Sequence, residues 1–228
     1  MDPDGLFHSV IIASTGRRDI LGETVRAVLK QTRPPDEVIV AIVGPDDFDP
    51  SLLCEDRVRV VHSPGGLTRQ LNTAVAGLDA RCRTVTIFDD DVEPADNYLD
   101  RVVDCFRQHP EMALFDGWVL QDGQISREDA RKLLAAARNN RSRRLLAAKQ
   151  AYGCNMNVRR AVLEKVRFDE RLPQYAWNFD LDFSRRVRGL GCAVARNPEC
   201  RLVHLASGVG RLSEQRFGYS QVVNPVYI

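Results

Sequence analysis

The segment TVTIFDDDVEP, residues 84–94, runs an apolar, strand-like stretch directly into three consecutive carboxylates, Asp89, Asp90 and Asp91. Three adjacent negative charges repel one another, and each carboxylate prefers water to the end of a buried strand. Such a cluster is tolerated on a flexible surface loop, or where a cation neutralises it. The sequence around the segment is needed to distinguish these two interpretations.

Strand-like and helix-like segments alternate on the N-terminal side of the acidic cluster. The strand-like segments are 7–13, 37–43, 58–62 and 84–88, and the helix-like ones are 20–29 and 68–78. This alternation predicts an α/β fold with a mainly parallel central sheet flanked by helices, Rossmann-like in its N-terminal half. Because parallel sheets bind ligands beyond the carboxyl ends of their strands, the position of the cluster favours a ligand.

The second half of the chain is less regular. Its pattern predicts helices over 96–109, 126–149 and 179–191, a turn leading into a helix over 151–166, and strands over 112–120, 192–195 and 201–204. The helix expected over 126–149 is rich in arginine and lysine. It is interpreted either as a surface that meets anionic lipid headgroups or a lipid diphosphate, or as an ordinary solvated face.

Composition limits the class of protein. The chain has 228 residues, of which 44% are hydrophobic and 28% charged, and a formal net charge of +1. This balance predicts one soluble domain and gives no electrostatic reason to expect nucleic acid as a partner. Without a signal peptide, a membrane-spanning stretch or a C-x-x-C pair, the six cysteines are expected to be reduced thiols in a cytoplasmic protein.

Six segments, taken in order, resemble the family 2 glycosyltransferases, which have the GT-A fold and are nucleotide-sugar-dependent and inverting. They are VIIASTGRRDILGETVRAVLKQT, PGGLTRQLNTAV, IFDDDVEP, GCNMNVRRAVLEKVRFDE, WNFDLDFSRRVRGLG and LVHLASG. The resemblance extends from about residue 7 to residue 204. It implies a single domain over 1–228, with a nucleotide-sugar-binding half at about 7–110 and an acceptor-binding half at about 111–228.

The acidic cluster matches the D-x-D motif of this family. The resemblance implies that Asp91 ligates a divalent metal ion, Mn²⁺ or Mg²⁺, and that Asp89 and Asp90 lie at the nucleotide. It also places a further metal contact at His204, although a half-buried strand histidine without a ligand is the alternative. Carboxylate oxygens are ligands that both ions accept.

Other pieces of the resemblance concern the nucleotide. Thr15 and Arg17 fit the first loop of the donor pocket, and Arg69 and Asn72 match positions that approach the nucleotide. The alternative for the last two is a solvated arginine at a helix start and a capping asparagine.

The catalytic base of the family falls on Asp180, and the acid that follows it falls on Asp182. The glutamate that usually precedes the base is replaced by Phe179. These acids are alternatively ordinary residues of a first helical turn, favoured there by the helix dipole. The aromatic residues around Asp180, which are Trp177, Phe179 and Phe183, are expected to line a cleft.

The resemblance also implies a loop beneath the donor sugar and the acceptor. That loop is expected to contain Gly153, Asn155 and Met156, with Trp177 and Asp182 contributing to the same region.

The implied reaction is metal-dependent, inverting transfer of a hexosyl or deoxyhexosyl group from a nucleotide-diphosphate sugar to a hydroxyl of a glycan or lipid-linked acceptor. The expected setting is cell-surface glycan synthesis in the cytoplasm, with peripheral contact with the inner membrane surface. The replacement at Phe179 keeps open a non-catalytic nucleotide-sugar or glycan-binding module. A phosphohydrolase of the haloacid dehalogenase type is disfavoured, because its aspartates usually lie near the N-terminus and Glu93 stands where it has a threonine or valine.

Overall fold

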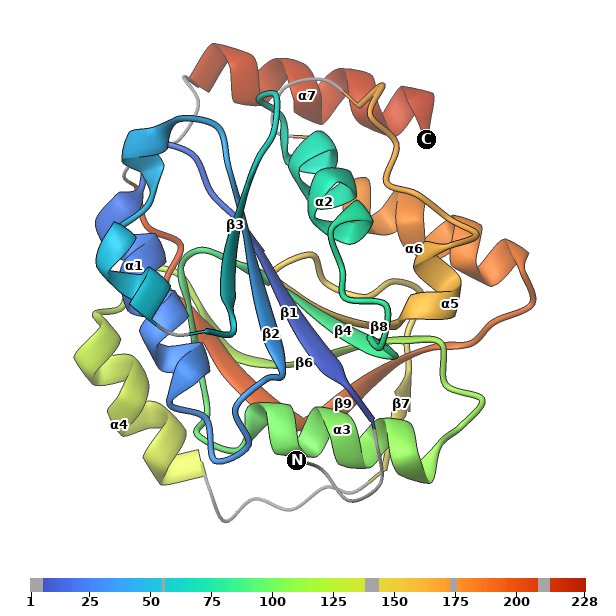
Figure 1. Ribbon diagram of the computed structural model, residues 1–228. Helices are drawn as coiled ribbons and strands as arrows, with labels where there is room; N and C mark the ends of the chain where they lie inside the picture. Colours follow the sequence, from blue (N-terminus) through green and yellow to red (C-terminus); the bar gives the residue numbers. More distant parts are fainter. Residues whose placement is uncertain (1–5, 55, 138–143, 173–175, 209–213) are drawn as a thin grey trace.

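The computed structural model describes residues 6–54, 56–137, 144–172, 176–208 and 214–228. A single sheet forms its centre, with strand order β3-β2-β1-β4-β8-β6-β9-β5, and β7 pairs with β9 (Figure 1). Helices cover both faces of this sheet (Figure 1). The α/β fold expected from the alternating pattern is therefore confirmed.

The N-terminal part of the sheet is parallel. Strand β1 (His8–Ala13) lies between β2 (Glu37–Ile42) and β4 (Thr84–Asp89), and β2 also pairs with β3 (Val58–His62). Successive β1 side chains enter opposite cores: Ile12 packs on one face and Ile11 on the other. Burial on both faces explains why these strands are continuous apolar runs without alternation.

The second half adds strands of both directions to the same sheet. Strand β8 (Asn155–Arg159) is antiparallel to β4 and to β6 (Leu114–Asp122). Strand β9 (Val194–His204) is parallel to β6 and antiparallel to β5 (Val92–Pro94) and β7 (Leu146–Ala147). The pairing of β5 with β9 brings the end of the chain's last strand beside the acidic cluster.

The helices divide between two hydrophobic cores. Helices α1 (Arg18–Leu29) and α3 (Tyr98–Gln108) pack on one face, and α2 (Leu67–Ala76), α5 (Arg160–Leu163) and α6 (Phe179–Gly189) on the other. Helix α4 (Arg127–Ala137) packs on Val203 through a smaller cluster. Helix α7 (Glu214–Tyr227) contacts the segment before α6, where the Asn224 amide donates to the Trp177 carbonyl oxygen over 2.9 Å.

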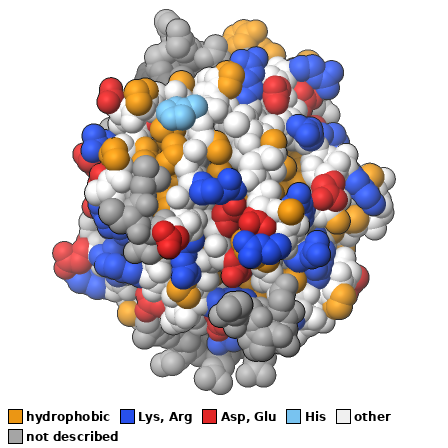
Figure 2. Space-filling view, viewed as in Figure 1, with side chains coloured by type: hydrophobic (Ala, Val, Ile, Leu, Met, Phe, Trp, Pro, Cys, Tyr) orange, Lys and Arg blue, Asp and Glu red, His pale blue; other side chains and the backbone are white. Residues whose placement is uncertain are grey.

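The long basic helix expected over 126–149 is wrong for its C-terminal part. Helix α4 ends at Ala137, and Leu146 and Ala147 form strand β7 against β9; residues 138–143 lie outside the described residues. Pairing with β9 satisfies the backbone of β7 in a way that helical spacing does not reveal. On the face seen in Figure 2, basic side chains are interspersed with acidic ones.

Two other expectations for the second half are also wrong, and two elements of the chain were not predicted. The segment 151–166 contains strand β8 before its short helix, and the two strands expected over 192–204 are the single strand β9. Helix α7 and strand β5 were not expected. The sequence of β8, NMNVR, hid a strand because the polar side chains of Asn155 and Asn157 are buried and hydrogen-bonded inside the sheet.

The cysteines agree with the expectation of reduced thiols where the structure describes them. Cys82, Cys105, Cys154 and Cys200 are buried, Cys192 is partly exposed, and all five are free. Across the described ranges, no helix combines the length and the hydropathy that a membrane span needs.

Candidate active site

The acidic cluster lies where two parallel strands end together. Asp89 is the last residue of β4 and pairs with Ala13, the last residue of β1, so the loop after β1 faces the cluster. The Ser14 hydroxyl donates to Asp90 Oδ2 over 2.5 Å, and the Arg17 guanidinium forms an ion pair with the other Asp90 oxygen. Asp90 is therefore buried and held by partners from the first loop.

Arg17 also binds the next carboxylate. Its Nη2 lies 2.7 Å from Asp91 Oδ2 and 3.0 Å from the carbonyl oxygen of Ser207, and the Ser207 amide donates to the same Asp91 oxygen over 2.9 Å. The loop after β1 and the loop after β9 therefore meet at Asp91. Repulsion within the triplet is offset by a guanidinium that bridges two of its three members.

His204 approaches the cluster from the end of β9. The pairing of Val92 with His204 brings its Nε2 to 3.1 Å from Asp91 Oδ1 and 3.7 Å from Asp89 Oδ2. One ligand atom from each of Asp89, Asp91 and His204 lies within 4.8 Å of the others. The two carboxylate oxygens are ligands that suit Mn²⁺ or Mg²⁺, and the imidazole nitrogen adds a third donor atom. The residues present therefore fit a divalent cation.

Two residues that the sequence did not single out hold the far side of His204. Its Nδ1 lies 2.8 Å from Asp122 Oδ1, and the Tyr152 hydroxyl donates to Asp122 Oδ2 over 2.8 Å. Asp122 is the last residue of β6 and reaches the register of His204 after an irregularity in the β6–β9 pairing. An acid at the end of a predicted strand was the signal available, but the strand was predicted to end at residue 120.

The charges around Asp91 and Asp89 separate their pKa values. Burial alone would raise the pKa of Asp91, but the bonds to His204 and Arg17 outweigh it and hold that pKa well below its usual range. Burial raises the pKa of Asp89 to about 7 against the attraction of His204. Burial opposes protonation of His204, yet Asp91, Asp89 and Asp122 raise its pKa to about 9. Of these two carboxylates, Asp91 is the one whose charged form its neighbours favour.

Asp180 is the second residue of α6 and is 8% exposed. Its Oδ2 accepts a hydrogen bond from the Gly153 amide over 3.0 Å, and its Oδ1 accepts one from the Leu181 amide over 2.9 Å. Burial raises the pKa of Asp180, and the backbone amides only partly oppose this. The carboxylate is thus fixed in orientation by neutral donors, with a raised proton affinity.

One short turn, Tyr152–Gly153–Cys154, connects the acidic cluster with Asp180. The Cys154 carbonyl oxygen accepts from the Asp89 amide over 3.1 Å, and Gly153 donates to Asp180. A Cβ on Gly153 would lie 2.9 Å from the Phe179 ring, so only glycine fits between the turn and α6. The turn places the candidate cation ligands and the candidate base on its two sides.

Several residues expected around the sugar lie inside the protein instead. Asn155 and Met156 belong to strand β8 and are fully buried, so they do not form a loop. The Asn155 side chain accepts from the Gly117 amide, and Met156 packs in the core, so the expectation of a loop at these two residues is wrong. Phe179 and Phe183 also pack in the core against Phe168, so they do not line a cleft.

The remaining residues expected in the acceptor half lie near the start of α6. Trp177 is partly exposed, one residue before the helix N-cap. Asp182 forms an ion pair with Arg186 one turn further along α6.

Of the residues expected in the nucleotide pocket, some are exposed and one is buried. Thr15 is exposed beside Gly16, whose φ of +68° makes the turn after β1, and the Gly16 amide donates to Asp47 Oδ1 over 2.6 Å. Arg69 is exposed on α2. The Asn72 amide, by contrast, is buried and bonded to the backbone of Phe168, so it ties α2 to that segment.

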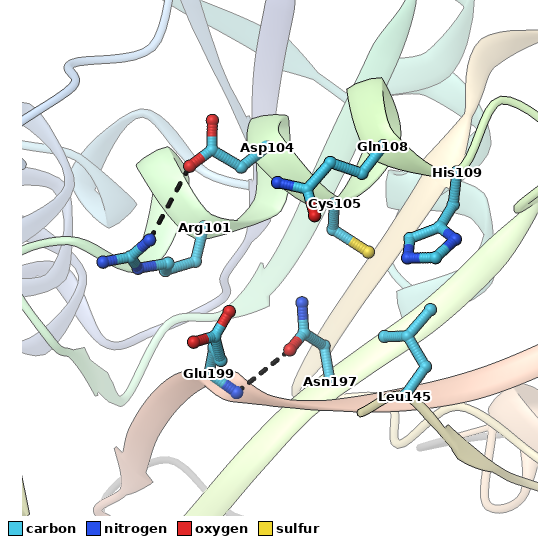
Figure 3. A pocket seen from close by; sticks show the side chains of 8 residues that line it. All are labelled: Arg101, Asp104, Cys105, Gln108, His109, Leu145, Asn197 and Glu199. Carbon is cyan, nitrogen blue, oxygen red and sulfur yellow. Dashed lines mark hydrogen bonds and ion pairs between the residues drawn. The ribbon is translucent and has the colours of Figure 1, made fainter. Parts of the chain in front are cut away.

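A separate hollow lies between α3 and β9 (Figure 3). It shares no residue with the acidic cluster. Its lining residues come from α3 and the residue after it, from β9 and from the segment before β7: Arg101, Asp104, Cys105, Gln108, His109, Leu145, Asn197 and Glu199.

Comparisons with known proteins agree with this architecture. A family model described as glycosyl transferase family 2 matches residues 9–167. The glucosyl-dolichyl phosphate glucuronosyltransferase of Haloferax volcanii is 24% identical over 177 residues, which cover 69% of this chain and 54% of that protein. The chain therefore spans about half the length of that curated relative.

Two solved structures show the same fold. The mannosyltransferase PcManGT of Pyrobaculum calidifontis, in complex with GDP-Man and Mn²⁺, has a TM-score of 0.67 at 17% identity, covering 90% of this chain and 58% of that chain. S. aureus TarS 1-349 has a TM-score of 0.64 at 14% identity, covering 88% and 60%. Because the family model covers most of the sheet and both strands that flank the acidic cluster, this chain belongs to glycosyl transferase family 2 and has the GT-A fold.

Proposed function

We propose that this chain is a metal-dependent, inverting glycosyltransferase that uses a nucleotide-diphosphate sugar. The observation that carries the proposal is the turn Tyr152–Gly153–Cys154, which has a candidate cation site on one side and a buried carboxylate on the other. The family membership and the GT-A fold support the same activity. The PcManGT structure is a complex with Mn²⁺, and this supports a divalent ion here as well.

The donor would bind at the carboxyl ends of β1 and β4. Asp91 and His204, with Asp89 beside them, would hold Mn²⁺ or Mg²⁺, which when bound stabilises the negative charge of the departing diphosphate. Thr15, Arg17, Asp89 and Asp90 would face the nucleotide, and the exposed Arg69 would approach it from α2. Arg17 is already aimed at this site by Asp90 and Asp91 and supplies a second positive charge.

Asp180 would act as the general base. Its carboxylate is fixed by two backbone amides and has a raised pKa, so it is oriented and able to accept a proton from an acceptor hydroxyl. That oxygen would then attack the anomeric carbon from the face opposite the nucleotide, which inverts the configuration. Gly153, Trp177 and Asp182 would contribute to the same region.

The division of labour would follow the sheet. The half at about 7–110 would bind the nucleotide sugar, and the half at about 111–228 would bind the acceptor. The name of the Haloferax volcanii relative, with its glucosyl-dolichyl phosphate, supports a lipid-linked acceptor. We further propose hexosyl or deoxyhexosyl transfer in cell-surface glycan synthesis, in the cytoplasm and with peripheral contact with the membrane.

A non-catalytic nucleotide-sugar or glycan-binding module is the second candidate. It is favoured by Phe179, whose ring packs in the core where the family usually has a glutamate. The two candidates differ at Asp180: a base is needed for turnover but not for binding.

The test is release of nucleoside diphosphate from a panel of UDP-, GDP-, dTDP- and CDP-sugars, with Mn²⁺ or with EDTA, using simple glycosides and polyprenyl-linked glycosides as acceptors. We expect release with one class of donor, dependent on Mn²⁺ and slowed by about 10²–10⁴-fold in Asp180→Asn. NMR of the product should show the anomeric configuration opposite to that of the donor. Donor binding without turnover in every arm would support the binding module instead.

A further inference from the structure

The backbone of the acidic turn is held from behind by a residue of α1. Thr24 is fully buried, and its hydroxyl lies 2.6 Å from the Asp90 carbonyl oxygen and 3.3 Å from that of Val92. These two carbonyl groups stand on either side of Asp91. A hydroxyl has one proton to donate and can also accept, so Thr24 can hold the turn and still receive a donor.

That donor is Arg127, the first residue of α4. Its Nη2 lies 3.0 Å from the Thr24 hydroxyl, and its Nη1 lies 3.0 Å from the Val92 carbonyl oxygen. The same guanidinium forms ion pairs with Glu93 and Glu23. Figure 1 shows α4 beside α1, so this one side chain joins the two helices to the turn.

The ion pair between Arg127 and Glu93 is buried, with the two side chains 10% and 7% exposed. A buried ion pair is poor support for a purely stabilising role, because apolar residues of the same size often stabilise as well or better. Here the guanidinium does something an apolar side chain does not, since it donates to the carbonyl group next to a candidate metal ligand. Arg131 offers a contrast: it also binds Glu93, but it is 61% exposed, and no bond from its side chain to the turn is found among the described residues.

We infer that Thr24 and Arg127 are positioning residues that fix the turn Asp89–Val92 so that Asp91 and Asp89 converge with His204 on a cation. This inference rests on the proposed function. Thr24 and Arg127 act through hydrogen bonds to main-chain carbonyl groups, so they set the positions of the carboxylates without contacting the cation. Groups that orient metal ligands in this way commonly change metal affinity by about 10–100-fold when removed.

Two matched pairs of variants test the positioning role of Thr24 and Arg127. Thr24→Val keeps the shape and removes the hydroxyl, whereas Thr24→Ser keeps the hydroxyl. Arg127→Met removes the bonds to the turn, whereas Arg131→Met removes only a bond to Glu93. Mn²⁺ affinity is measured by electron paramagnetic resonance of the free ion, without nucleotide, and amide hydrogen exchange is followed over residues 89–92 in the metal-free protein.

We expect Thr24→Val and Arg127→Met to weaken Mn²⁺ binding by about 10–100-fold and to speed exchange in the turn. Thr24→Ser and Arg131→Met should bind Mn²⁺ within about twofold of wild type. A folded Thr24→Val protein with wild-type Mn²⁺ affinity and wild-type amide exchange would overturn the inference. If Arg127→Met does not fold, the comparison of Thr24→Val with Thr24→Ser is sufficient to test it. Wild-type protein that binds no Mn²⁺ would contradict the proposed function. In that case, amide exchange in the turn tests the role of Thr24 and Arg127 separately. Unchanged exchange in Thr24→Val would overturn that role, and faster exchange would support it.

Discussion

Two buried carboxylates on opposite sides of one turn have opposite surroundings. Asp91 is bound by the side chains of Arg17 and His204, and its pKa lies below its usual range. Asp180 is bound by the neutral amides of Gly153 and Leu181, and burial raises its pKa. Burial alone raises the pKa of both carboxylates, so the neighbouring charges decide the outcome. The first suits an acid that stays charged and holds a cation, and the second suits one that takes a proton.

The largest effect should come from removing the base while leaving the cation site intact. Asp180→Asn keeps the size of the side chain and can keep a bond to the Gly153 amide. General base catalysis typically contributes about 10²–10⁴-fold, so we expect kcat to fall by that amount. Binding of Mn²⁺ and nucleoside diphosphate, measured by calorimetry, should be unchanged. If kcat stays within about threefold of wild type, Asp180 is not the base.

The pH dependence of turnover should sharpen the same contrast. A base must be unprotonated, and burial raises the pKa of Asp180, so the acidic limb of kcat/KM should lie above the ordinary range of an aspartate. Below that pKa the rate should fall by about tenfold per pH unit at saturating Mn²⁺. The profile is measured for wild type and for Asp180→Glu. An acidic limb at the ordinary aspartate pKa would show that burial does not tune this group.

A smaller effect is expected from the turn that joins the two carboxylates. A Cβ on Gly153 would lie 2.9 Å from the Phe179 ring, whereas one on Gly189, in the same helix as Asp180, would meet nothing within 4 Å. Gly153→Ala should destabilise the protein by about 1–3 kcal/mol and lower kcat by about tenfold by moving α6 away from the turn. Gly189→Ala is the control in denaturant unfolding and in activity. Equal behaviour of the two variants would show that the close approach at Gly153 is unimportant.

The smallest effect on turnover is expected at His8, which together with His204 repeats the contrast. His204 sits among carboxylates with its pKa raised to about 9, whereas His8 in β1 is buried between Thr84 and Thr86, and burial, with Arg33 in second place, lowers its pKa to about 3. Because the unfolded chain binds a proton below about pH 6.5 and the folded chain does not, His8 contributes stability above that pH.

This contribution should be lost as the pH falls from about 6.5 toward 3, at no more than about 1.4 kcal/mol per pH unit. It is measured as the difference in unfolding free energy between wild type and His8→Gln across this range. A difference that does not change with pH would show that His8 is not held neutral.

The parallel half of the fold could be predicted from the sequence because its strands and helices each show a local sequence pattern. Each strand there is a short apolar run buried on both faces, and each helix shows an apolar face at regular spacing. Residues at the carboxyl ends of those strands, such as Asp89 and Arg17, could therefore be placed near one another without a structure. The convergence of His204 with them came from the family resemblance, since it depends on the pairing of β5 with β9 far along the chain.

The second half could be read less well because its polar residues are used inside the fold. Asn155 and Asn157 are buried polar residues that bond to neighbours within the sheet, so strand β8 does not resemble a strand. Asp122 and Thr24 gain their roles from contacts with residues more than sixty positions away. No local pattern carries such contacts. The same holds for Phe179, which the sequence places beside the base but whose ring turns into the core.

The proposed cation-dependent diphosphate site is tested most directly by the unfolding free energy of wild type, Asp180→Asn and Asp91→Asn with UDP, GDP, dTDP or CDP, each with Mn²⁺ or with EDTA. At about 100 times Kd, a ligand that binds only the folded protein adds about 2.7 kcal/mol. We predict that one nucleotide stabilises wild type and Asp180→Asn with Mn²⁺, and that EDTA or Asp91→Asn removes the effect. Stabilisation that persists both with EDTA and in Asp91→Asn would contradict a cation-dependent diphosphate site at the acidic cluster. The absence of stabilisation by all four nucleotides would contradict it as well.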